Sequence, residues 1–106
     1  MITYRATGIV LGNCWDGGIC GYAASTITAT NRASLVQQIE NGIKDGSLDS
    51  GTGFESLIGA VMVISTIDTR EIDGKTFIAT EDEIEVYGDL TPGQEKWLKA
   101  MSLQLS

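Results

Sequence analysis

Two cysteines provide the most versatile chemistry in this 106-residue chain. Cys14 and Cys20 are separated by five residues, which is not a standard metal-binding spacing. The chain contains no histidine, the commonest metal ligand in proteins, so a zinc site would need ligands from elsewhere or from a second chain. The two thiols can remain reduced and packed, or they can form a disulfide if their Cα atoms lie about 5.5 Å apart. The sequence leaves these two alternatives open and predicts no metal site.

An acidic run is the second chemically distinctive group, and it contains Glu81, Asp82, Glu83 and Glu85. Alternate residues of a strand share one face, so the three glutamates would form a row with a spacing of roughly 7 Å. This spacing is close to that of phosphates along a nucleic-acid strand, so the row can bind a basic groove. The alternative is a solvated strand whose charges discourage edge-to-edge aggregation.

Enzymatic chemistry is poorly supported by these residue types. Histidine, the commonest general base near neutral pH, is missing. No G-x-S-x-G nucleophile motif is present, and nothing obviously raises the pKa of a carboxyl group in the acidic run. The sequence therefore predicts a protein that is not an enzyme, with no catalytic residues and no cofactor.

The net charge of −7, from 14 acidic and 7 basic residues, restricts the class of partner. It opposes direct nucleic-acid binding, which depends on neutralising phosphates, and it permits a protein partner with a basic surface. No apolar run approaches the roughly 20 residues that cross a bilayer. No secretory signal is visible at the N-terminus, so a cytoplasmic location is expected, and such a location favours reduced thiols.

Secondary-structure elements must position these residues. The first half of the chain predicts a hairpin followed by a helix. Strands are expected at Tyr4–Leu11 and Ile19–Thr30, joined by the three-residue loop Asp16–Gly18. This register places Cys14 opposite Cys20.

One face of this first hairpin carries Ile9 and Leu11 and is expected to be the core face. Gly8, on the other face, predicts close approach of a backbone, and a homodimer or a partner strand can fill the space beside it. The alternative is that nothing fills this space and the Gly8 face of the sheet is exposed to solvent.

A helix is expected after the first hairpin. Thr30 or Asn31 can cap its N-terminus, the helix continues to about Asp45, and Gly46 provides a C-terminal stop.

The second half of the chain repeats this organisation. Ile58–Ile72 and Lys75–Tyr87 are expected to pair through a type I′ turn at Asp73–Gly74. A final helix is expected to begin at Pro92 with Thr91 as its cap.

The predicted fold class is therefore α+β, ββα-ββα, with a four-stranded antiparallel sheet and two helices packed on one face. A single domain over residues 1–106 is expected, with units 1–46 and 57–106 joined by a polar loop at 47–56.

Two functional hypotheses follow. The first is a small acidic non-enzymatic binding protein that acts through protein–protein contacts, and its specific version is an inhibitor of basic nucleic-acid-handling machinery of the phage or mobile-element type. Its contact residues would be the acidic run together with three residues of the first hairpin, Trp15, Asp16 and Tyr22. Trp15 can anchor a partner, or it can fold back over the sheet. The second hypothesis is a small-ligand-binding or minor enzymatic domain that uses the 47–56 loop.

Overall fold

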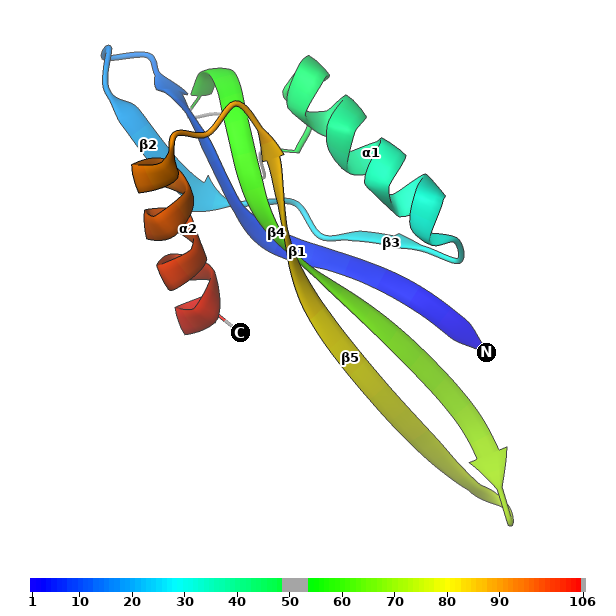
Figure 1. The fold of residues 1–106 in the computed structure, drawn as a ribbon. Helices are drawn as coiled ribbons and strands as arrows, with labels where there is room; N and C mark the ends of the chain where they lie inside the picture. The colour runs from blue at the N-terminus through cyan, green and yellow to red at the C-terminus, as the bar shows by residue number, and fades with distance from the viewer. Residues whose placement is uncertain (49–53, 106) are drawn as a thin grey trace.

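The computed structural model describes residues 1–48 and 54–105 and has an α+β fold. The elements follow one another as β1 (Ile2–Cys14), β2 (Ile19–Ala23), β3 (Ile27–Ala29), α1 (Arg32–Asp45), β4 (Phe54–Ile72), β5 (Lys75–Gly88) and α2 (Pro92–Leu105). Figure 1 shows the curved sheet, the two helices and a long two-stranded projection. The predicted class is correct, but the sheet has five strands rather than four.

The sheet has the order β2-β1-β4-β5, and β3 pairs with β1 farther along the edge that β2 occupies. The expected single strand Ile19–Thr30 is therefore two short strands, and the ββα-ββα order is not observed. The cause lies between β2 and β3, where the Ser25 amide leaves the sheet and donates a hydrogen bond to the carbonyl of Leu48 at 2.8 Å. The irregularity shifts the register by one residue, so Ile27 lies opposite Ala6.

Helix α1 forms where its capping residues indicate. The side chain of Asn31 accepts a hydrogen bond from the Ser34 amide at 3.1 Å, which satisfies one of the free amides of the first turn. Gly46 ends the helix in the left-handed conformation, with φ of 81°. Leu35 and Ile39 on the inner face of the helix are fully buried.

Strands β4 and β5 pair in the predicted register, which places Val61 opposite Val86. Asp73 and Gly74 both have positive φ, at 54° and 75°, as a type I′ turn requires. Strand β4 begins at Phe54, earlier than predicted, because its first residues pair with the end of β1. The loop predicted at 47–56 therefore ends sooner.

The β4–β5 hairpin extends well beyond the rest of the sheet. Strand β1 stops pairing where the Thr69 amide donates to the carbonyl of Met1 at 2.9 Å. Residues 70–77 beyond this point form a two-stranded arm, which gives the molecule a long axis of 57 Å (Figure 1).

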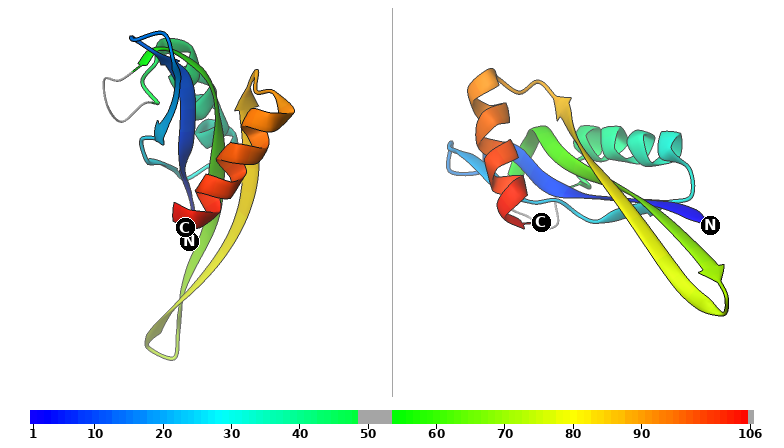
Figure 2. Two further views of the ribbon diagram at one scale, coloured as in Figure 1. Left: turned by 90° about the vertical axis from the view of Figure 1, so that its left-hand side faces the viewer. Right: turned by 60° about the horizontal axis from the view of Figure 1, so that its bottom comes forward.

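The two helices cover opposite faces of the sheet, which corrects the prediction of one shared face (Figure 2). Helix α1 packs on the larger core with Val10 and Met62, whereas Leu98 of α2 packs with Ile9 and Val61. The Ile9 face is thus the smaller of two cores and not the single core. The reason is that β1 and β4 are apolar on both faces, as central strands covered on both sides must be.

Gly8 illustrates how closely the central strands pack. A Cβ atom at Gly8 would lie 2.2 Å from the Val61 carbonyl oxygen and 2.8 Å from the Met62 Cα. The close backbone that the sequence predicts beside Gly8 is therefore that of β4 in the same chain.

Candidate functional site

The end of the β1–β2 hairpin is a tight three-residue loop. The Gly17 amide donates to the Cys14 carbonyl at 3.0 Å, and the Cys14 amide donates to the Gly18 carbonyl at 2.8 Å. The loop is thus Trp15–Gly17, one residue earlier than predicted, and Gly17 rather than Gly18 has the positive φ of 90°. The Asp16 carboxylate accepts a hydrogen bond from the Gly18 amide at 3.0 Å, which favours this position of the turn.

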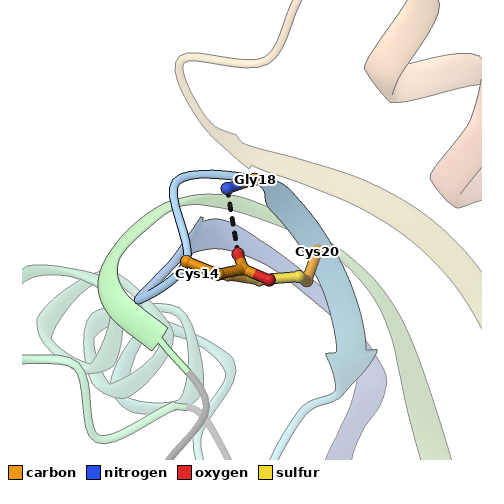
Figure 3. Close-up of a disulfide and its surroundings, with 4 residues drawn as sticks. Cys14, Gly18 and Cys20 are labelled. Carbon is orange, nitrogen blue, oxygen red and sulfur yellow. Dashed lines mark hydrogen bonds between the residues drawn. A yellow bond between two sulfur atoms is a disulfide. The ribbon is translucent and has the colours of Figure 1, made fainter.

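Cys14 and Cys20 form a disulfide directly behind this loop (Figure 3). The shifted register pairs Cys20 with Gly12, so the two cysteines are diagonal neighbours rather than the predicted opposite pair. Their Cα atoms are 6.1 Å apart, within the usual range for disulfides. Of the two alternatives left open by the sequence, the structure contains the disulfide, and its effect is to close the hairpin end covalently.

Large apolar side chains are exposed around this closed loop. Trp15 is 70% exposed, so it does not fold back over the sheet. Ile19 and Tyr22 of β2 are also exposed and lie on opposite faces of the hairpin. Trp15, Asp16 and Tyr22, the three predicted hairpin residues, thus lie at one end of the molecule.

Trp97 of α2 adds a residue that the sequence did not indicate. Its ring lies over Gly21, where an added Cβ would be 3.3 Å away, yet 48% of Trp97 is exposed. Gly21 and Ile19 are on the same face of β2, so α2 extends the apolar surface of the hairpin on that face. No local motif could have placed Trp97 there, because β2 and α2 are far apart in the sequence.

The acidic run of β5 divides between the two faces of the sheet. Glu81, Glu83 and Glu85 lie on the α1 face, as alternation predicts. Asp82 lies on the α2 face, where its carboxylate accepts a hydrogen bond from the Ser65 hydroxyl at 2.6 Å. The carboxylate row therefore consists of the three glutamates only.

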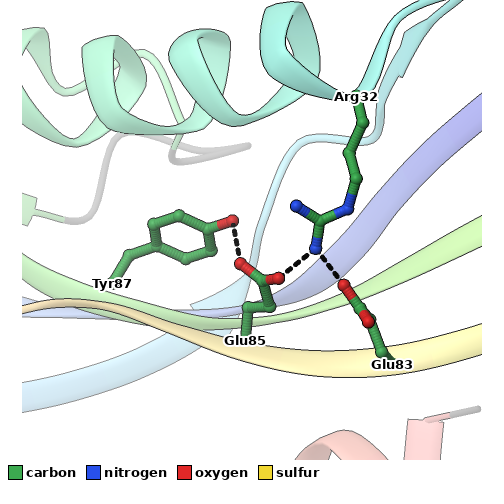
Figure 4. A network of polar contacts seen from close by, with 4 residues as sticks. All are labelled: Arg32, Glu83, Glu85 and Tyr87. Atoms are coloured by element: carbon green, nitrogen blue, oxygen red, sulfur yellow. Dashed lines mark hydrogen bonds and ion pairs between the residues drawn. The ribbon is translucent and has the colours of Figure 1, made fainter.

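Arg32 in the first turn of α1 binds two members of this row (Figure 4). Its guanidinium donates hydrogen bonds to one carboxylate oxygen of Glu83 and one of Glu85. The Tyr87 hydroxyl donates to the second oxygen of Glu85 at 3.0 Å. Glu81 is exposed and lies outside this network.

The network changes the acidity of three of its groups, and the hydrogen bonds to Glu85 and Glu83 raise the pKa of Arg32. Partial burial by itself raises the pKa of Glu85, but the hydrogen bonds from Arg32 and Tyr87 outweigh it and hold that pKa below its ordinary value. Burial and the neighbouring Glu85 carboxylate raise the pKa of the Tyr87 phenol. Near neutral pH, Glu85 is therefore an ionised hydrogen-bond acceptor, and the network joins α1 to β5.

An open cleft of about 680 Å³ lies between the second half of α1, the start of β4 and the end of β5. It is lined by Glu40, Ile43, Lys44, Leu57, Ile58, Val86, Tyr87, Gly88 and Asp89. Within the part of the chain that the structure describes, no three potential metal-ligating side chains come together. Residues 49–53 of the loop expected to bind a ligand lie outside the described residues.

Comparison of the chain with protein families, with curated proteins and with solved structures finds no match. Neither helix in the described ranges has the length and apolar character needed to cross a membrane.

Proposed function

We propose that this chain is a non-enzymatic binding protein that acts through protein–protein contacts, with the end of the β1–β2 hairpin as its main contact surface. The observation that carries this proposal is the exposure of Trp15 on a loop closed by the Cys14–Cys20 disulfide. A tryptophan that is 70% exposed contributes little to the packing of its own fold.

The physical basis of this proposal is the low cost of ordering such a loop. Disulfide closure and the short turn already restrict the backbone around Trp15, so binding a partner orders few additional degrees of freedom. Tryptophan and tyrosine supply a large share of the binding energy in many protein interfaces. Trp15 on the closed loop is therefore a preorganised apolar contact for a partner, with Ile19 exposed on one face of the hairpin behind it and Tyr22 exposed on the other.

The specific version of the proposal is an inhibitor of basic nucleic-acid-handling machinery. The net charge of −7 and the exposed carboxylates of β5 support a partner with a basic surface. Arg32 neutralises part of the row, so Glu81 is expected to contribute most to such a contact.

The test compares the captured partners of the wild-type protein with those of Trp15→Ala. Proteins captured from a cell extract are identified by mass spectrometry, and the affinity of the purified partner is then measured by titration calorimetry. Trp15→Ala is expected to weaken binding at least tenfold. The matched control is Ile2→Ala, which removes another exposed apolar side chain near the opposite end of β1.

Unchanged binding by Trp15→Ala would overturn the hairpin contact. A small molecule retained by the purified protein in native mass spectrometry would instead favour the ligand-binding alternative. Weaker binding at raised salt would support the basic partner, because salt screens contacts between exposed charges.

A further inference from the structure

Strand β5 is the last strand of the sheet, and no described strand pairs with its outer edge. Ile72 and Lys75 flank the two-residue turn and form the first hydrogen-bonded pair of the hairpin. Every second residue from Lys75 onward therefore bonds to β4. The residues between them direct their amide and carbonyl groups outward, away from the sheet.

The outward-directed residues in the first half of β5 lack the charges that usually protect an edge strand. They are Thr76, Ile78 and Thr80, which are uncharged and β-branched. Ile78 is 67% exposed and its neighbour Phe77 is 53% exposed. The glutamates of β5 have the other parity, so their backbones already bond to β4. This edge is therefore suited to accept another strand.

The sequence of this edge is complementary to itself in one antiparallel register. A two-fold axis at Ile78 would place Ile78 opposite the same residue of a second copy. Around this pair, Phe77 would face Ala79, Thr76 would face Thr80, and Lys75 would face Glu81. The Thr76–Thr80 and Lys75–Glu81 pairs join side chains of kinds that stabilise sheets when they lie opposite each other.

Charge also disfavours registers centred on the acidic run. An axis at Glu81, or one residue beyond it, would place acidic residues of the two copies opposite one another, which is unfavourable. With the axis at Ile78, Glu83 and Glu85 fall outside the paired segment, where Arg32 already binds them.

We propose that two copies of this chain pair through the outer edges of β5, antiparallel and centred on Ile78, to form one continuous sheet. This interface goes beyond the proposed hairpin contact, because β2 and β5 are at opposite edges of the sheet. The segment is short, so the dimer is expected to dissociate on dilution.

The experiment measures the mass of the full-length protein by sedimentation equilibrium over a range of concentrations. The wild-type protein is expected to dimerise. Lys75→Glu, which places like charges opposite each other twice per dimer, should raise the dissociation constant at least tenfold. The double variant Lys75→Glu/Glu81→Lys exchanges the charges and should restore the dimer. Circular dichroism and thermal unfolding verify that each variant is folded.

A wild-type protein that stays monomeric at millimolar concentration would overturn the proposal. A double variant that is folded but fails to recover dimerisation would also overturn it, because the register requires Lys75 to face Glu81. Trp15→Ala should dimerise like the wild-type protein, so failure of the hairpin contact and failure of the β5 interface are distinguishable.

Discussion

Arg32 and Glu85 join the first turn of α1 to the edge strand β5, although they lie 53 positions apart in the sequence. Their contact makes the acidic run part of the fold as well as a feature of the surface. Two of the three glutamates that could face a partner also bind the chain's own cation.

Replacing Arg32 with methionine should destabilise the protein, because Glu85 would keep its partly buried charge without a cationic partner. The urea midpoint of unfolding is expected to fall more than in Lys99→Met, which breaks the exposed pair with Glu95 within α2. Equal midpoints for the two variants would show that the Arg32 contact contributes no more than an ordinary surface pair.

Stability should depend on pH through Glu85. Its pKa is lowered in the folded state, so the ionised carboxylate stabilises the protein above the ordinary glutamate range, and this contribution is lost as pH falls through the lowered folded-state pKa. The difference in unfolding free energy between wild type and Glu85→Gln should therefore shrink toward acid pH.

Glu81→Gln is the control for this pH dependence, because Glu81 carries a charge on the same strand but does not contact Arg32 or Tyr87. The unfolding free energy of Glu81→Gln should fall toward acid pH in the same way as that of the wild-type protein, because Glu85 is still present. A Glu85→Gln difference that stays constant from neutral to acid pH would contradict the role of the network.

The disulfide predicts that the denatured, unreduced protein contains no free thiol. Reduction, or the double variant Cys14→Ser/Cys20→Ser, should lower the free energy of unfolding by about 2 kcal/mol, because the closed loop is short. Thiol titration and urea unfolding measure the two quantities. Two free thiols per denatured chain would contradict the disulfide.

Gly8→Ala should be strongly destabilising, by about 3 kcal/mol, since the new Cβ would overlap the backbone of β4 at Val61 and Met62. The control is Gly17→Ala, where the space is open and only the positive φ opposes a side chain. That variant should cost about 1 kcal/mol. Thermal unfolding of both proteins measures the difference, and a larger effect at Gly17 would exclude the close packing of β1 on β4.

Features set by local chemistry could be predicted from the sequence. The register of β4 and β5 follows from Asp73 and Gly74, and the limits of α1 follow from Asn31 and Gly46. The β1–β2 loop was predicted one residue too late in the sequence, because two adjacent glycines, Gly17 and Gly18, suit the left-handed position equally well.

Features that depend on tertiary contacts could not be predicted in this way. The break between β2 and β3 depends on a hydrogen bond from Ser25 to Leu48, which local propensity does not reveal. The opposite placement of the helices depends on two apolar faces in β1 and β4, and alternation alone does not say which helix covers which face. Arg32 and Trp97 reach the candidate surfaces only once the chain has folded.

The positions of β2 and β5 at opposite edges of the sheet have a consequence for avidity. A dimer joined through β5 would carry one Trp15 loop at each outer edge of the continuous sheet. Such a dimer is bivalent, so after one loop binds, the other meets a nearby second site at a high effective concentration. A partner that repeats its binding site at a matching separation would therefore be retained far longer than a monovalent one.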